Sequence, residues 1–478
     1  MSSAAAEEGA RPVEGLAAPQ DLYRVLLIQK NGSKLLVAGE RPPFTLPCVE
    51  VPKWERVAEN LIAAVAKRYG ISAICLFTPE LSAAETDGGQ SLYQVMETRE
   101  DMIATSDDTR WLPLDSIPDQ AFADEQDLVA IANMLRQTAE FQNGEAIGPF
   151  GRLRWIEELS SWVQHEIEPN GLRLSGEFRQ LNASPTFALL RFETTGQAVW
   201  FKAVGEPNLR EFSISAALSR LFPEFVPTVI AIHPAWNGWL TAEFPGSTLD
   251  EVSDACTWEQ AAQTLAELQI ASVGETAELL RAGCRDIRIL PLLELVDPFI
   301  EVMSQLMTQQ QKTPPLPLRR EELRELGRQI KGALTAWARL NVPDTLGHLD
   351  FNPGNIVTSA DQCIFLDWAE AYVGPPFLTL EYLCEHLLRL PQKETRAGAD
   401  VIEKYEKKWR KILAPEIVSA ALGIAPVLAV FAYAAGTAVW RHPTVLQEPR
   451  TTAYLRSLTR RIRAEMRRLQ ERRQICCN

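Results

Sequence analysis

The residues best suited to chemistry lie in one short loop and in the strand that follows it. From His348 to Asn355 the pattern is His-x-Asp-x-x-x-x-Asn, and an apolar strand, Cys363 to Leu366, then leads to Asp367. Phosphoryl transfer to a hydroxyl needs one carboxylate that orients the acceptor and takes its proton. It also needs an amide and a second carboxylate that hold metal ions on the nucleotide phosphates. The types and spacing of these residues therefore indicate phosphoryl transfer.

A structural alternative exists for the same loop. Asn, Pro and Gly each favour tight turns, so the run Asp350 to Asn355 is also ordinary turn chemistry. The apolar strand that ends in Asp367-Trp368 at the expected distance favours the catalytic interpretation.

Length and composition limit the protein class. The chain has 478 residues, which predicts two or three domains, with 46% hydrophobic and 23% charged residues, as in globular proteins. A formal net charge of -14 argues against a nucleic-acid binder. The eight cysteines contain no C-x-x-C pair, which argues against a zinc site or disulfide framework. Residues 1–20 lack the pattern of a signal peptide, so we expect a solvated tail and a cytoplasmic protein.

One uncharged segment, Ile417 to Trp440, is long enough to span a bilayer. Gly423, Pro426 and Gly436 interrupt it, and a proline breaks an ordinary helix. We therefore expect a pair of buried helices and no transmembrane span.

Residues 21–142 predict a compact α+β domain. A turn at Asn31-Gly32 joins two strands, and an amphipathic helix is closed by Gly70. The expected elements are strands Tyr23–Ile28, Lys34–Ala38, Ile74–Phe77 and Leu92–Met96, and helices Trp54–Tyr69 and Glu125–Gln137.

This order of elements resembles a Nudix domain. When the Nudix signature is anchored on Gly70, its first Glu falls on Glu55, but its two metal-binding glutamates fall on Lys67 and Arg68. Cations cannot replace carboxylates around magnesium. The resemblance thus implies a Nudix-like α/β/α domain that lacks the hydrolase site.

A strand-rich region follows the linker 143–152. A helix, Leu153–Ile167, is expected first. The expected strands are Glu177–Leu181, Phe187–Glu193, Ala198–Val204 and Trp239–Phe244, followed by a loop at Pro245-Gly246.

Lys202 stands among apolar residues of the third strand, where it either snorkels at an edge or has a function. Glu211, near the start of the helix Leu209–Leu221, is its candidate partner or simply an acid that favours the helix dipole. Ser184, in the turn between the first two strands, offers a hydroxyl to phosphates.

Helices dominate the rest of the chain. We expect Trp258–Ala271, Pro291–Met307 and Arg319–Leu340. The C-terminal segment 450–478 carries an apolar stripe flanked by many arginines. We expect this helix to pack on the acidic body of the same protein, with an acidic partner as the alternative.

From about residue 153 to 445, the chain resembles the aminoglycoside phosphotransferase and choline kinase-like family. Lys202, the segment Glu243 to Gly246, the loop from His348 and Asp367-Trp368 occur in that family's order. The resemblance implies an α+β, bilobal protein-kinase-like fold with a small β-rich lobe and a large helical lobe.

The same resemblance implies the role of each site residue. Asp350 would be the catalytic base, Asn355 and Asp367 would bind magnesium, and His348 would anchor the loop. The residues implied in nucleotide binding are Lys202, Glu211, Ser184, Glu243 and Phe244. ATP or GTP, with Mg²⁺, is the implied cofactor set.

The chain departs from the family pattern at two places. Leu349 replaces a loop glycine, and Leu378 to Glu381 lacks an aspartate that often supports the catalytic segment. Either departure fits an alternative, a nucleotide-binding pseudokinase or regulatory protein without turnover. A Nudix-type hydrolase is the third reading, which Lys67 and Arg68 argue against.

The sequence therefore predicts a small-molecule kinase whose acceptor is aminoglycoside-, choline- or sugar-like. The predicted segments are a tail (1–20), a Nudix-like domain (21–142), a linker (143–152), a β-rich lobe (153–245), a helical lobe (246–449) and a basic C-terminal helix (450–478).

Overall fold

The computed structural model describes residues 19–53, 56–81, 92–101, 108–118, 121–144, 148–389 and 395–477. The chain divides into two compact units. Unit 1 comprises Met1–Phe212 and Thr228–Glu243, and unit 2 comprises Ser213–Pro227 and Phe244–Asn478. Most of the predicted tail and the signature position Glu55 lie outside the described residues.

The first sheet of unit 1 is built around strand β1. Its order is β4-β5-β1-β2-β6, with β3 also paired to β1. β1 runs parallel to β5 and antiparallel to β2 and β3. The strands are β1 Gln20–Ile28, β2 Lys34–Ala38, β3 Cys48–Pro52, β4 Ala73–Phe77, β5 Leu92–Thr98 and β6 Thr109–Pro113.

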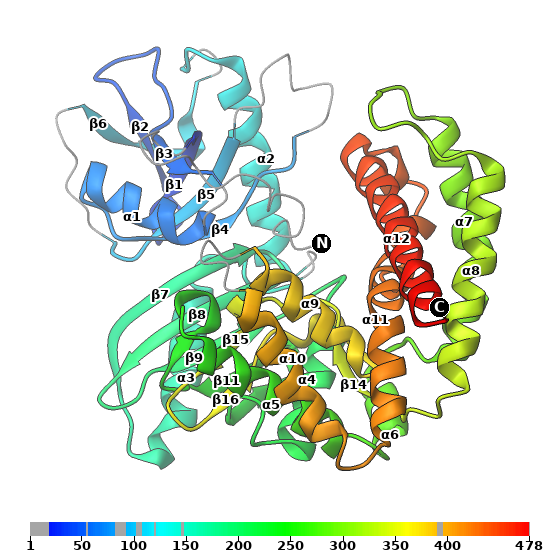
Figure 1. The fold of residues 1–478 in the computed structure, drawn as a ribbon. Helices are drawn as coiled ribbons and strands as arrows, with labels where there is room; N and C mark the ends of the chain where they lie inside the picture. Colours follow the sequence, from blue (N-terminus) through cyan, green and yellow to red (C-terminus); the bar gives the residue numbers. More distant parts are fainter. Residues whose placement is uncertain are drawn as a thin grey trace. The chain divides into compact units, whose positions relative to one another are not determined.

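Helices cover both faces of this sheet because successive side chains of a strand point to opposite faces. Val25 and Leu27 of β1 share a core with helix α1, Val57–Tyr69. Leu26 and Ile28 share a different core with helix α2, Glu125–Gln142. The labels α1 and α2 mark these two helices beside the sheet in Figure 1.

Helix α1 ends where the sequence predicts. Gly70 adopts the left-handed conformation, with a φ of 67°, and its N–H donates to the Ala66 carbonyl at 2.9 Å. Lys67 and Arg68 are exposed on the last turn of the helix. The helix starts at Val57, three residues later than predicted. The resemblance to a Nudix domain stays a prediction.

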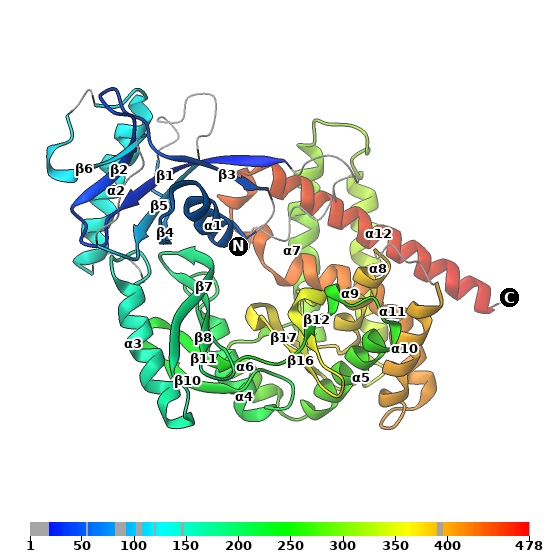
Figure 2. The same cartoon turned by 90° about the vertical axis from the view of Figure 1, so that its left-hand side faces the viewer.

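The second sheet of unit 1 has the order β10-β11-β9-β8-β7. The neighbouring strands are all antiparallel, and Figure 2 shows helix α3 running beside them. The elements are α3 Trp155–Ile167, β7 Leu174–Ser184, β8 Phe187–Thr194, β9 Val199–Ala203, α4 Arg210–Leu221, β10 Val229–His233 and β11 Gly238–Ala242. Strand β7 is longer than predicted, and the edge strand β10 was not predicted.

The two sheets of unit 1 share a hydrophobic core. Phe150, in the predicted linker, is only 2% exposed and contacts the rings of Trp155, Phe201 and Trp236. Residues of the first sheet, such as Leu26, belong to the same cluster. This part of the linker is therefore a packed element of unit 1.

Unit 2 is mainly helical and has one large core. Its main helices are α5 Ala255–Ala271, α6 Thr276–Ala282, α7 Ile289–Thr308, α8 Arg320–Ala338, α9 Phe377–Leu387, α10 Thr395–Trp409, α11 Pro415–Gly436 and α12 Pro449–Cys477. The short strands are β12 Ser247–Thr248, β13 Arg285–Asp286, β14 Thr345–His348, β15 Ile356–Thr358, β16 Cys363–Phe365 and β17 Ala371–Gly374. The predicted α+β class is confirmed.

The uncharged segment forms one helix, α11, where the sequence predicts two. Pro426 lies inside it and removes one backbone hydrogen bond. Burial of residues on both sides of Pro426, such as Ala425 and Val427, offsets that loss. Within the described residues, α11 is the one helix whose length and apolar character would allow it to cross a membrane, and 61% of its apolar window is buried inside the protein.

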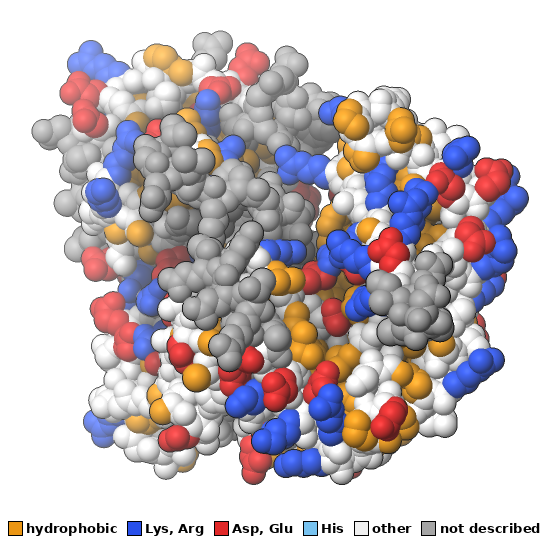
Figure 3. Space-filling model, in the orientation of Figure 1, with side chains coloured by type: hydrophobic (Ala, Val, Ile, Leu, Met, Phe, Trp, Pro, Cys, Tyr) orange, Lys and Arg blue, Asp and Glu red, His pale blue; other side chains and the backbone are white. Residues whose placement is uncertain are grey.

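Helix α12 packs against α11 and α7 of the same unit. Five apolar side chains form its buried stripe: Leu455, Leu458, Ile462, Met466 and Leu469. Arg461 pairs with Glu385, and Arg463 pairs with Glu322 of α8. Figure 3 shows positive and negative side chains interspersed on this helical unit. An acidic partner for α12 stays a prediction.

We expect Glu381, on α9, to make stability depend on pH. Burial raises its pKa to about 7, and Glu465 adds to this shift, while Arg472 and Arg461 oppose it. Because the folded-state pKa lies above the ordinary value of 4.5, the folded protein binds the extra proton, and stability falls as pH rises from about 4.5 to 7. Glu381→Gln should therefore raise the free energy of unfolding by ~1–2 kcal/mol at pH 8 and by much less at pH 5.

Urea unfolding of both proteins at the two pH values measures this difference. The exposed variant Glu416→Gln on α11 is the control. An equal effect of Glu381→Gln at both pH values would contradict the prediction.

Candidate active site

His348 joins the loop from His348 to Asn355 to the strand before Asp367. It ends β14 and is 1% exposed. Its Nδ1 accepts a hydrogen bond from the Asp350 N–H at 3.1 Å, and its Nε2 lies 3.2 Å from the Leu366 carbonyl oxygen. An Nδ1 that accepts and an Nε2 that donates define a neutral imidazole. These contacts are those of a loop anchor.

Asp350 and Asn355 are held together by the loop backbone. The Asn355 Nδ2 donates to the Asp350 carbonyl at 3.0 Å, so the Asn355 Oδ1 is the acceptor atom of this amide. The Asp350 Oδ1 accepts from the Asn352 Nδ2 at 3.2 Å. The loop thus fixes the amide and the carboxylate independently of any ligand.

A hairpin brings Asn355 and Asp367 to the same end of one small sheet. Strands β15 and β16 pair antiparallel, with Ile356 opposite Phe365. The Leu366 N–H extends this ladder by donating to the Asn355 carbonyl at 2.8 Å. Asp367 then has a φ of 60°, a left-handed conformation that is uncommon for a residue other than glycine. Such strained residues cluster at functional sites.

Leu349 fits the loop without backbone strain. It is not among the residues with positive φ, its side chain is 2% exposed in the core, and its N–H donates to the Glu370 carbonyl at 3.0 Å. This position therefore does not require glycine in this chain. The replacement of the family's loop glycine by Leu349 therefore leaves the loop intact.

Thr379, on α9, supports the loop through a hydrogen bond to the His348 backbone. This contact was not predicted. The Thr379 Oγ1 accepts from the His348 N–H at 3.1 Å and lies 3.0 Å from the Tyr372 hydroxyl. Thr379 is fully buried. It lies in the segment where the family often has an aspartate, so a neutral hydroxyl supports the loop there. Spacing alone gave no signal for this contact.

The residues just after Asp367 serve the fold. Tyr372 is fully buried and donates to the Pro375 carbonyl at 3.0 Å, and Trp368 is 4% exposed. Glu370 forms a two-point ion pair with Arg285, with both distances 2.8 Å. These three residues therefore do not identify the acceptor.

Tyr433, on α11, has a hydroxyl whose pKa is shifted, which the sequence did not indicate. Burial raises the pKa of its hydroxyl, and Tyr454, Asp350 and Glu370 raise it further.

In unit 1, Lys202 and Glu211 form an ion pair. Lys202 lies on β9, and Glu211 lies in the first turn of α4, with its side chain only 2% exposed. The Lys202 Nζ also lies 5.9 Å from the centre of the Trp239 ring. A pair of this kind holds a lysine in position for phosphates in kinases.

Ser184 ends β7 at a tight hairpin. Its hydroxyl accepts from the Thr186 N–H at 3.3 Å, and Ser184 pairs with Phe187 across the turn. The turn between β7 and β8 is therefore Pro185-Thr186. The Ser184 hydroxyl retains its own proton for donation.

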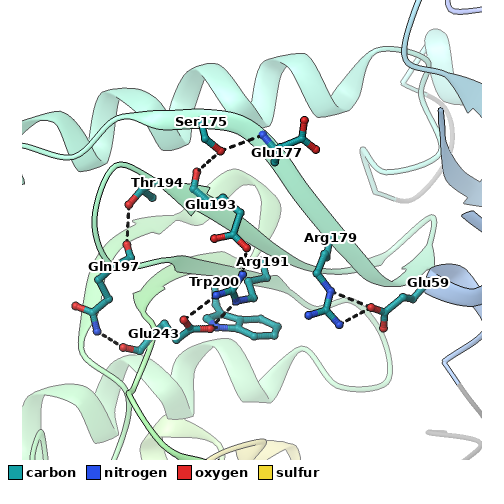
Figure 4. A network of polar contacts seen from close by, with 10 residues as sticks. All are labelled: Glu59, Ser175, Glu177, Arg179, Arg191, Glu193, Thr194, Gln197, Trp200 and Glu243. Carbon is teal, nitrogen blue, oxygen red and sulfur yellow. Dashed lines mark hydrogen bonds and ion pairs between the residues drawn. The ribbon is translucent and has the colours of Figure 1, made fainter. Parts of the chain in front are cut away.

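Glu243, at the end of unit 1, is occupied by neighbouring groups (Figure 4). Arg191 donates to its two carboxylate oxygens at 2.6 and 2.9 Å, which holds the pKa of Glu243 below its usual value, and Trp200 donates at 3.0 Å. The Glu243 N–H donates to the Ala198 carbonyl at 2.9 Å, and the Glu243 carbonyl accepts from Gln197. Glu243 therefore holds the strand end in place, and Phe244 beside it is half-buried. Nucleotide binding by either residue stays a prediction.

Within the described ranges, no group of three or more His, Cys, Asp and Glu side chains is arranged to bind a metal ion. Magnesium commonly uses one or two protein carboxylates and completes its shell with phosphate oxygens and water. An Asn355 oxygen and the Asp367 carboxylate at one hairpin end fit that requirement.

The fold and loop described above define a kinase-like phosphotransferase. Residues 209–410 match the model of the phosphotransferase enzyme family. The match confirms the predicted resemblance and the predicted enzyme class, a phosphotransferase that acts on hydroxyl groups.

Solved structures with similar folds include two named enzymes. A macrolide 2'-phosphotransferase from Brachybacterium faecium is 14% identical, with a TM-score of 0.41 over 63% of this chain and 98% of that chain. A choline kinase from Cryptosporidium parvum is 14% identical, with a TM-score of 0.45 over 65% of this chain and 96% of that chain. At these identities and TM-scores the likenesses carry no weight for function. No curated protein matches the chain.

We expect Thr379→Val to weaken the loop anchor. Valine has the shape of threonine but cannot accept the His348 N–H, so a buried donor loses its partner. The free energy of unfolding should fall by ~1–3 kcal/mol. Thr335→Val, on the exposed face of α8, should change it by no more than ~0.5 kcal/mol. Denaturant unfolding tests both, and an equal small effect would contradict the anchor role.

Proposed function

We propose that the protein transfers the γ-phosphoryl group of ATP, with Mg²⁺, to a hydroxyl of a small molecule. The observation that carries this proposal is the loop from His348 to Asn355 joined to the hairpin that ends at Asp367. The His348 ring and the Asn355 amide fix three groups of the predicted set on one rigid frame.

In this proposal, Asp350 orients the acceptor hydroxyl and takes its proton as the phosphoryl group is transferred. Asn355 and Asp367 would hold Mg²⁺, which neutralises phosphate charge when it is bound. Lys202, held by Glu211, contacts the nucleotide phosphates, and Ser184 and Phe244 contribute a hydroxyl and backbone groups. Positioning and charge neutralisation supply most of the rate enhancement.

The acceptor is a small hydroxyl compound of the aminoglycoside, choline or sugar kind. Arg285 neutralises Glu370, so Glu370 is a weak candidate for binding a cationic acceptor. Whether GTP replaces ATP stays open.

A nucleotide-binding protein without turnover is the alternative. Leu349 and the missing downstream aspartate motivated this alternative. The unstrained, buried Leu349 no longer favours it, and Thr379 supports the loop in the segment that lacks the aspartate. A Nudix-type hydrolase is the third candidate, and the exposed Lys67 and Arg68 argue against it.

Asp350→Asn tests the base directly. The amide keeps the shape of the side chain but cannot accept the proton, so turnover should fall by ~10²-fold or more. Binding of Mg-ATP, measured by calorimetry, should change little. Asp361→Asn, an exposed change in the same hairpin, should keep full activity. Full turnover in Asp350→Asn would contradict the assignment, and binding without turnover in the wild type would favour the pseudokinase.

Glu211→Gln tests the lysine pair. Without the carboxylate, Lys202 loses the charge that orients it, and the KM for ATP should rise by about tenfold or more. Glu278→Gln removes the carboxylate of an exposed ion pair with Arg220 and should leave the KM unchanged. An unchanged KM in Glu211→Gln would show that Lys202 does not depend on this partner.

A further inference from the structure

The hairpin tip that carries Ser184 is packed against the segment between the two sheets of unit 1. We name residues 148–150 the strap. Gly148 has a φ of +88°, and a Cβ there would overlap the Pro185 carbonyl oxygen and lie 3.1 Å from the Thr186 Cα. The Phe150 N–H also donates to the Pro185 carbonyl at 3.4 Å. The strap backbone thus lies directly on the backbone of the turn.

A second glycine confines the same turn. A Cβ at Gly205, just after β9, would overlap the Thr186 side chain and lie 2.9 Å from the Thr186 carbonyl oxygen. Pro185 and Thr186 are therefore in close contact with two backbone segments. Since close-packed atoms leave no free space, the turn cannot shift unless one of these segments also moves.

The strap is fixed to the N-terminal sheet. Phe150 is buried in the shared core, and Leu153 lies next to Gly32 in the β1–β2 turn. The Arg154 N–H donates to the buried Glu97 carboxylate of β5 at 3.0 Å. The strap therefore links the first sheet to the hairpin tip, so the position of the tip depends on the position of that sheet.

Strand β7 is attached to the N-terminal sheet at a second point. The Gln180 side chain accepts from the Cys75 N–H and donates to the Cys75 carbonyl, both at 2.9 Å, and is 2% exposed. Arg179 also pairs with Glu59 of α1 (Figure 4). The strand that leads to Ser184 is thus held by the N-terminal domain at Arg179 and Gln180.

We propose that the strap positions the Ser184 hairpin for the nucleotide phosphates, which makes the N-terminal domain a working part of the nucleotide site. This inference rests on the proposed function, which assigns the hairpin to the nucleotide. It gives a role to a domain in which Lys67 and Arg68 argue against a hydrolase site. A purely structural strap would alter stability but leave nucleotide affinity unchanged.

Two glycines of the same segment provide a matched pair of variants. Gly148→Ala and Gly144→Ala both place a side chain at a positive φ, +88° and +72° respectively. Only Gly148 is packed, because nothing lies within 4 Å of a Cβ at Gly144. The difference between the two variants therefore isolates the contact between the strap and Pro185.

Hydrogen exchange across residues 183–187 and calorimetric titration with Mg-ATP are the measurements. In Gly148→Ala we expect faster exchange at the hairpin and about tenfold weaker Mg-ATP binding, with both unchanged in Gly144→Ala. Phe150→Leu loosens the strap without adding atoms. It should also speed exchange at the hairpin and weaken Mg-ATP binding, and it replaces Gly148→Ala as the test if that variant fails to fold.

Two outcomes would overturn the proposal. One is unchanged exchange in Gly148→Ala and Phe150→Leu. The other is faster exchange with wild-type affinity, which is the result expected of a structural strap. Failure of the wild-type protein to bind Mg-ATP would contradict the proposed function instead, while the exchange comparison would still test whether the strap holds the hairpin.

Discussion

The two ring nitrogens of His348 make the contacts on which the catalytic region depends. One accepts from the Asp350 N–H and the other faces the Leu366 carbonyl, so a single buried ring fixes the distance between the loop and the strand before Asp367. A neutral imidazole can make both contacts only in one tautomer. Thr379 holds the His348 backbone, which extends the same chain of contacts into α9. A displaced ring would separate Asp350 from Asp367.

In unit 1, ion pairs hold the candidate side chains in place. The Lys202–Glu211 pair lies between β9 and α4, and Arg191 locks Glu243 at the end of β11. These charged groups are partly buried, where each ion pair is stronger than it would be in water. The strap and Gln180 tie the hairpin to the N-terminal domain. Both units thus place the candidate residues on rigid elements.

The sequence predicted the elements whose signals are local. The pattern from His348 to Asp367, the strand that carries Lys202 and the helix stop at Gly70 are encoded within a few neighbouring residues. The family match later confirmed the enzyme class.

The contacts that were missed join residues distant in the chain. Thr379 meets His348, and Gln180 meets Cys75, and no local pattern marks either pair. Pro426 was misjudged for a related reason. A proline usually breaks a helix, but the burial that keeps α11 continuous comes from helices elsewhere in the chain. The contacts of Glu243 were also missed, because its partners Arg191 and Ala198 come from two other segments.

The most direct test of phosphoryl transfer follows the terminal phosphoryl group itself. Wild-type protein is incubated with Mg²⁺, ATP labelled at the γ-phosphate, and a panel of aminoglycosides, amino alcohols and sugars, and products are separated and analysed by mass spectrometry. The account predicts that the label appears on a hydroxyl of at least one panel member. Binding of ATP without transfer of label to any of them would contradict it.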